Sequence, residues 1–209
     1  MAVRSWTLDE KKFLSTGEVK RLLRTAEARA GNALQAGNNA ATRDYFIVHL
    51  GLSTGLRVSE MVSLKCGDLF VRDGISSLVV RRGKGGKARS VAFNGAFKQH
   101  VARYLRWKKE TGEPAAEDAP LLLSSATGRA MTTRALQKAF KRCAARAELS
   151  PRYSIHSLRH TYACHLYKAS GWNLRLVQKQ LGHSSIATTQ VYADVMEPDM
   201  RQALERLYR

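Results

Sequence analysis

The sequence has few cysteines, few acidic residues and no long apolar run. Its three cysteines, Cys66, Cys143 and Cys164, are widely spaced and form no C-x-x-C pair, which argues against a disulfide framework or a zinc knuckle. No stretch approaches the roughly 20 apolar residues that a membrane span requires, and the N-terminal MAVRSWTLDEKK lacks the apolar run of a signal peptide. We therefore expect reduced thiols, a cytoplasmic location and no membrane partner.

The shortage of acidic side chains leaves the chain strongly basic. Lysine and arginine total 35 against 17 for aspartate and glutamate, so the net charge is 35 − 17 = +18, with a pI near 10.3. Such a charge favours a polyanionic partner, because each neutralised phosphate releases counterions. A membrane-surface binder would also be basic, but no lysine-rich amphipathic helix beside an apolar anchor is found. Nucleic acid is the expected partner.

Hydrophobic spacing predicts a chain rich in helices. At 209 residues and 44% apolar content, it can form one domain or two small ones. The capping-box pattern of Ser15 and Glu18 predicts a helix start. Further helices are expected over 43–52, from Val58, from Phe97, from Thr133 and from His156, then over 173–181 with Gly182 as its cap, around Tyr192, and after Pro198.

One segment departs from the helical period. Residues 68–93 contain β-rich runs separated by Asp73-Gly74 and by the glycine turn GKGGK at 83–87, a pattern typical of antiparallel hairpins. The predicted fold class is therefore α+β and mainly helical, with a small three-stranded antiparallel sheet.

Five short motifs occur in a specific order along the chain. They are Arg57 in TGLRVSE, Lys84 in the glycine turn, the H-x-x-R of His156 and Arg159, the L-G-H of His183, and Tyr192 nine residues later. Each motif alone is weak, but the ordered set resembles the tyrosine recombinases, the phage-type integrases. The resemblance spans about residues 13–205 and implies their catalytic fold, with cleavage and rejoining of DNA through a covalent 3′-phosphotyrosine.

The chemistry of such a reaction suits these residue types. A tyrosine oxygen that attacks phosphorus conserves the bond in a covalent link, which a DNA hydroxyl can later reverse. Planar guanidinium groups match the charge on the non-bridging oxygens, which suits Arg57 and Arg159. Most arginines are merely solvated charges or plain phosphate contacts, and only position relative to the motifs distinguishes these two. Tyr192 has the spacing of the nucleophile, unlike Tyr162 or Tyr167.

The histidines and the glycine-turn lysines receive roles from the resemblance. His156 is the expected acid or base beside Arg159, and His183 a hydrogen-bond donor to phosphate. His160 is left outside the catalytic set as a support for its helix. A zinc site built on His156 and His160 is improbable because Ser157 replaces the glutamate of H-E-x-x-H, so neither a metal nor another cofactor is expected.

Lys84 is the expected general acid for the departing 5′ oxygen, with Lys87 as the competing candidate. A P-loop is excluded because Ala88 follows Lys87. Glu60 is expected to brace the first arginine. Four basic residues are predicted to bind DNA: Arg82, Lys87, Arg89 and Arg134.

The resemblance also implies domains and partners. We expect an extension at 1–12, the catalytic domain at 13–197 and a tail helix at 198–209, without an N-terminal core-binding domain, as in the short fimbrial inversion recombinases or an excised fragment. The expected partner is double-stranded DNA with specific recombination sites of a mobile element, bound as a homotetramer on paired sites by a protein that is monomeric in solution. Two alternatives stay open: a type IB topoisomerase that relaxes DNA, and a non-catalytic DNA-binding regulator.

Overall fold

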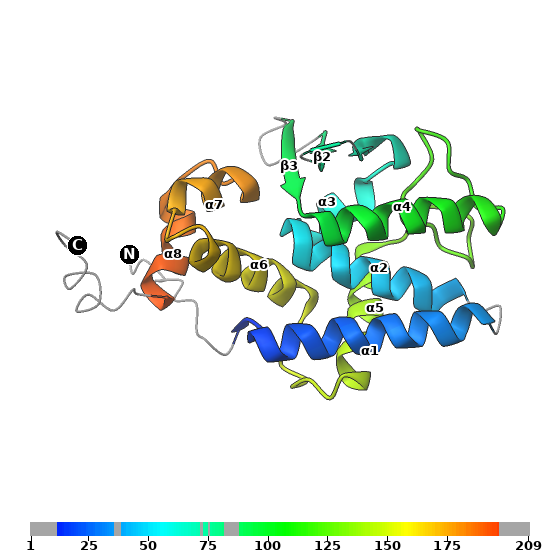
Figure 1. Ribbon diagram of the computed structural model, residues 1–209, viewed down its shortest axis with the longest axis horizontal. Helices are drawn as coiled ribbons and strands as arrows, with labels where there is room; N and C mark the ends of the chain where they lie inside the picture. The colour runs from blue at the N-terminus through cyan, green and yellow to red at the C-terminus, as the bar shows by residue number, and fades with distance from the viewer. Residues whose placement is uncertain (1–11, 36–38, 72, 75, 82–87, 197–209) are drawn as a thin grey trace.

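A computed structural model describes residues 12–35, 39–71, 73–74, 76–81 and 88–196. Helices make up most of this part, and a small sheet covers one side of them (Figure 1). The predicted tail helix after Pro198 and the predicted DNA-contacting or catalytic residues Arg82, Lys84 and Lys87 lie outside the described residues.

The first helix, α1 (Thr16–Gln35), begins at the predicted capping box. The backbone N–H of Ser15 donates to Glu18 Oε2 at 2.8 Å, and the Glu18 N–H donates to Ser15 Oγ at 3.3 Å. These bonds satisfy N–H groups that the first turn of a helix leaves free. Leu22, Ala26 and Ala30 form the buried stripe of α1, which packs along α2.

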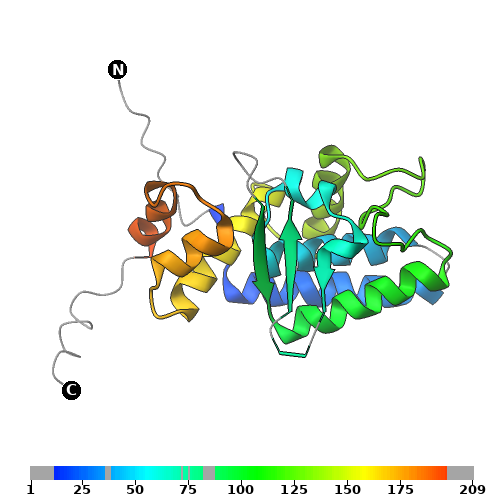
Figure 2. The same ribbon diagram turned by 90° about the horizontal axis from the view of Figure 1, so that it is seen from above.

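Helix α2 (Asn39–Thr54) lies at the centre of the molecule. It contacts α1, α4 (Gly95–Glu110), α5 (Thr133–Arg146) and α6 (Ile155–Ala169), which surround it in Figures 1 and 2. A helix buried on several sides needs apolar residues on more than one face, and Phe46, Ile47, Val48 and Leu50 are all fully buried. The C-terminal end of α2 is thereby fixed next to α6.

The sheet follows the short helix α3 (Val58–Ser63) and a 3-10 turn at Cys66–Asp68. Strands β1 (Leu69–Phe70), β2 (Ser76–Val80) and β3 (Arg89–Phe93) pair antiparallel in the order β1-β2-β3. Leu78 lies opposite both Leu69 and Val91, so one face of the sheet is apolar and buried. The prediction of a small three-stranded antiparallel sheet is confirmed.

Three helices form the other end of the molecule. α7 (Leu174–Leu181) and α8 (Ala187–Val195) pack on α6 around a second apolar cluster that includes Cys164, Val177 and Tyr192. Gly182 ends α7 in the left-handed conformation, with φ of 66°, as predicted for its cap. None of the helices in the described ranges is long and apolar enough to cross a membrane.

Candidate functional site

Arg57, the first arginine of the motif set, is the N-cap residue of α3. Its backbone N–H donates to Glu60 Oε2 at 2.8 Å, and its Nη1 donates to Glu60 Oε1 at 3.1 Å. The Arg57 side chain is 29% exposed, whereas Glu60 is only 5% exposed. Glu60 therefore binds both the backbone and the side chain of Arg57, and the Arg57 side chain stays partly exposed to solvent.

A second arginine, Arg89 of β3, binds the same carboxylate. Its Nη1 and Nη2 donate to Glu60 Oε1 and Oε2 at 2.8 and 3.0 Å, a bidentate pair. Burial alone would raise the pKa of Glu60, but hydrogen bonds from Arg89 and from the Arg57 backbone lower it below its ordinary value. Glu60 is thus a stable anion, and Arg89, predicted as a DNA contact, faces inward onto it.

Arg159 of α6 is the most deeply buried cation of the site, at 7% exposure. Its Nη1 donates to the Gly55 carbonyl at 2.5 Å, and its Nη2 donates to the Leu181 carbonyl at 3.0 Å and to His183 Nε2 at 2.9 Å. These bonds join the ends of α2 and α7 to the middle of α6. Three of the five guanidinium N–H groups are thus used, which leaves two for a phosphate.

The bond from Arg159 determines the protonation of His183. A guanidinium can only donate, so His183 Nε2 must accept, and the ring proton then lies on Nδ1. That nitrogen contacts Thr189 Oγ1 of α8 at 2.9 Å. Burial, followed by the charges of Arg159, Arg57 and Arg89, lowers the pKa of His183 to about 4. In this state His183 is neutral and orients Arg159. The expected donation from His183 to a phosphate would require a proton on Nε2, which here accepts from Arg159.

Tyr192 of α8 is 3% exposed, and its ring packs in the second apolar cluster. The hydroxyl lies 3.3 Å from His160 Nδ1. Burial raises the pKa of Tyr192 to about 12, although the charges of Arg159 and Arg57 oppose this shift. The cations therefore do not acidify the phenol in the protein without DNA, because desolvation has the larger effect.

The remaining predicted site residues lie further out. His156 follows the first residue of α6 and is exposed, although Arg159, one turn later on the same helix, is buried. Arg134 is exposed on α5. The structure thus gathers Arg57, Glu60, Arg159, His183 and Tyr192, with His156 at the edge.

Sequence reasoning missed two of the contacts. His160 was considered only as a zinc ligand and a helix support, yet it is the histidine at the Tyr192 hydroxyl. Arg89 was predicted to face DNA, yet it shares Glu60 with Arg57. The contact of His160 could have been suspected from its position directly after Arg159. Neighbouring residues on a helix point about 100° apart, so they can face two different partners.

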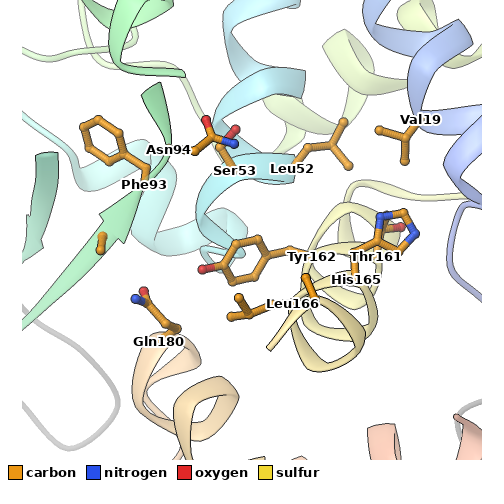
Figure 3. Close-up of a pocket in the computed structure, with 12 residues that line it drawn as sticks. Val19, Leu52, Ser53, Phe93, Asn94, Thr161, Tyr162, His165, Leu166 and Gln180 are labelled. Atoms are coloured by element: carbon orange, nitrogen blue, oxygen red, sulfur yellow. The ribbon is translucent and has the colours of Figure 1, made fainter. Parts of the chain in front are cut away.

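A pocket of about 350 Å³ lies on another side of α6. Tyr162 points into it from α6, and Leu52, Phe93, His165, Leu166 and Gln180 are among its other lining residues (Figure 3). None of the predicted catalytic residues that the structure describes lines this pocket. The candidate site is therefore the arginine cluster and not this pocket.

The cluster has the chemistry of an anion site with a phenol nearby. Arg57, Arg89 and Arg159 surround one carboxylate, Glu60, so the local charge stays positive. Within the described ranges, no group of three or more histidine, cysteine, aspartate or glutamate side chains could hold a metal ion. Fixed guanidinium donors can stabilise charge on a phosphodiester without a metal.

Gly182 allows Arg89 to lie against the end of α7. A Cβ atom at position 182 would lie 2.5 Å from Arg89 Nε, and the residue has a positive φ of 66°. Gly171 has a similar φ of 65°, but a Cβ atom there would meet nothing within 4 Å. We predict that Gly171→Ala lowers the free energy of unfolding by about 1 kcal/mol through backbone strain alone, and that Gly182→Ala lowers it clearly more. Urea unfolding measures this free energy for both variants. Equal losses of stability would contradict the close contact between position 182 and Arg89.

Comparison with known proteins shows which family the chain resembles in sequence and in fold. The phage integrase family matches residues 12–198. The chain is 36% identical over 190 residues to "Tyrosine recombinase XerD" of Ralstonia nicotianae, which covers 91% of this chain and 58% of that protein. Among solved structures, XerA recombinase matches with a TM-score of 0.72 and 26% identity, over 95% of this chain and 66% of that one.

The catalytic domain of bacteriophage HP1 integrase matches with a TM-score of 0.61 and 22% identity, over 94% of this chain and 95% of that domain, a likeness of fold. By comparison, this chain spans only a little over half the length of the XerD relative. Because the family match includes every described motif residue, the chain belongs to the phage integrase family, the tyrosine recombinases.

Proposed function

We propose that this chain carries the catalytic site of a site-specific DNA recombinase, which cleaves and rejoins DNA strands through a covalent 3′-phosphotyrosine. The observation that carries the proposal is the contact network between distant segments. Arg159 bonds to Gly55, Leu181 and His183, and the field of Arg159 reaches Tyr192. A buried phenol next to fixed guanidinium groups suits attack on a phosphodiester.

Each residue has a role in this reaction. Arg57 and Arg159 stabilise the charge on the non-bridging oxygens, and Glu60 with Arg89 holds Arg57 in place. Tyr192 attacks phosphorus, and the bond to the 5′ oxygen breaks. The exposure of His156 at the start of α6 supports a contact with the DNA strand near the scissile phosphate.

Formation of a covalent adduct tests the proposal. Duplexes are first selected from a random-sequence pool by their retention on the protein. They are then prepared with a nick next to the cleaved position. Cleavage releases the short fragment that carries the 5′ hydroxyl, so rejoining cannot occur and the adduct is trapped. We expect a protein–DNA band that survives denaturation and disappears with protease. A protein that binds these duplexes but forms no adduct would be a regulator, and one that relaxes any supercoiled plasmid without a site would be a topoisomerase.

The glycine-turn lysine has a separate prediction. If Lys84 protonates the departing 5′ oxygen, Lys84→Ala should cleave poorly on normal DNA and regain activity on a 5′-bridging phosphorothiolate, because sulfur leaves without a proton. Lys87→Ala is the matched control from the same turn and should need no such rescue. Rescue of Lys87→Ala in place of Lys84→Ala would reassign the general acid.

Exchange of strands also requires two DNA sites in one complex. We infer that the protein binds double-stranded DNA and assembles as a homotetramer on paired sites. The net charge of +18 supports DNA as the partner, and neighbours in the structure comparison include XerH site-specific recombinase bound to its difH substrate. We further propose that residues 198–209, which lie outside the described residues, dock onto a neighbouring subunit.

A further inference from the structure

We propose that His160, and not His156, accepts the proton of Tyr192 when the tyrosine attacks phosphorus. The inference rests on the proposed function and extends it to a residue outside the expected catalytic set. It starts from one contact: His160 Nδ1 lies 3.3 Å from the Tyr192 hydroxyl, with the two rings tilted by 49°. General bases are often slightly beyond ideal hydrogen-bond distance in proteins without substrate.

The other histidines near the site are poorly placed for this step. Both ring nitrogens of His183 are engaged, Nε2 by Arg159 and Nδ1 by Thr189. His156 is exposed at the start of α6. His160 is one turn further along α6 and half-buried, on the side that faces α8. Among the described residues, it is the histidine in contact with the reacting oxygen.

The position of His160 follows from the geometry of α6. Arg159 faces the ends of α2 and α7 through Gly55 and Leu181, and the next residue points about 100° away, toward α8. One helix therefore presents the phosphate-binding guanidinium and the proton acceptor as direct neighbours. Tyr192, carried by α8, is oriented between them, since it contacts His160 and senses the charge of Arg159.

Both groups of the pair are neutral before the attack. Burial, then the charges of Arg159, His156 and Lys12, lowers the pKa of His160 to about 4, so the ring is neutral and can accept at pH 7. With a pKa near 12, only on the order of one Tyr192 in 10⁵ is ionised at that pH. A base is therefore needed in the attack itself.

The step balances as follows. The Tyr192 oxygen forms its bond to phosphorus while its proton moves to His160 Nδ1, and the bond from phosphorus to the 5′ oxygen breaks with its electron pair on that oxygen. The leaving oxygen takes a proton from the general acid of the proposed function. In rejoining, the 5′ hydroxyl attacks phosphorus, and the His160 imidazolium returns its proton to the tyrosine oxygen as it leaves. Transfer is concerted with bond formation, because the phenol becomes acidic as its oxygen bonds to phosphorus.

Two substitutions separate a base from a positioning contact. His160→Asn places an amide oxygen near the position of Nδ1, so it can accept the Tyr192 hydrogen bond but cannot take the proton. His160→Ala opens space for added imidazole. His165→Asn, on the same helix and without a contact to Tyr192 among the described bonds, is the matched control. Single-turnover cleavage of the nicked duplex is followed from pH 7 to 10, with thermal unfolding and DNA binding as checks.

We expect His160→Asn to bind DNA normally and to cleave about 10²–10⁴ times more slowly, with His165→Asn near the wild-type rate. Imidazole should accelerate His160→Ala, and the rate of this variant should rise with pH as Tyr192 ionises. Wild-type cleavage by His160→Asn overturns the inference, as does a slow His160→Ala that responds to neither imidazole nor pH. If His160→Asn does not fold, the imidazole and pH responses of His160→Ala decide. An absence of adduct with the wild-type protein would instead refute the proposed function.

Discussion

Replacement of Tyr192 by phenylalanine is expected to abolish the covalent protein–DNA adduct while DNA binding persists. The change removes a single oxygen, so the ring still packs with Cys164, Val177 and Leu181 in the second apolar cluster. Among the described residues, the hydroxyl has a hydrogen-bond contact with His160, whose loss should cost about 1 kcal/mol of stability. Denaturing electrophoresis of trapped nicked duplexes measures the adduct, and a mobility shift measures binding.

Tyr162→Phe is the matched control for this experiment. Tyr162 is also on a helix of this end of the molecule and partly buried, and burial raises its pKa to about 12 as well. It points into the separate pocket, however, which none of the cluster arginines lines (Figure 3). We expect full adduct formation by Tyr162→Phe. An adduct formed by Tyr192→Phe, or one lost only in Tyr162→Phe, would show that Tyr192 is not the nucleophile.

Arg57→Ala and Arg159→Ala should each slow cleavage by about 10²–10³, by analogy with removal of one oxyanion donor. Their effects on stability should differ. Arg159 donates to Gly55, Leu181 and His183 from a buried position, so its loss leaves buried acceptors unpaired and should lower the free energy of unfolding by several kcal/mol. Arg57 is partly exposed and bonds to Glu60, which keeps Arg89 as a partner, so its loss should cost little.

Urea unfolding and single-turnover cleavage of both variants test this separation. A 5′-bridging phosphorothiolate should rescue neither variant, because the arginines act on the non-bridging oxygens and not on the leaving group. Cleavage by Arg57→Ala at the wild-type rate would remove this residue from the catalytic set. If Arg57→Ala lowered the free energy of unfolding as much as Arg159→Ala does, the role of Arg57 would be structural and not the binding of phosphate.

Much of the architecture could be predicted because its signals are local. The capping box of Ser15 and Glu18, the glycine cap at Gly182 and the hairpin pattern between 68 and 93 each depend on residues close in sequence. Backbone hydrogen bonding within a turn or a helix end is determined by those residues alone. The ordered motifs, from Arg57 to Tyr192, likewise predict the family, and the match over residues 12–198 confirms it.

The partners within the site could not be predicted in this way. Arg89 of β3 reaches Glu60 of α3 across 29 positions of sequence. His160 meets Tyr192 because α8 packs on α6. Such contacts depend on how helices and strands pack across long stretches of sequence, which periodicity does not specify. The sequence by itself determined which residue types are present for the proposed cleavage of DNA. Only the tertiary structure decided which histidine reaches the tyrosine, because burial and orientation are properties of the packed helices.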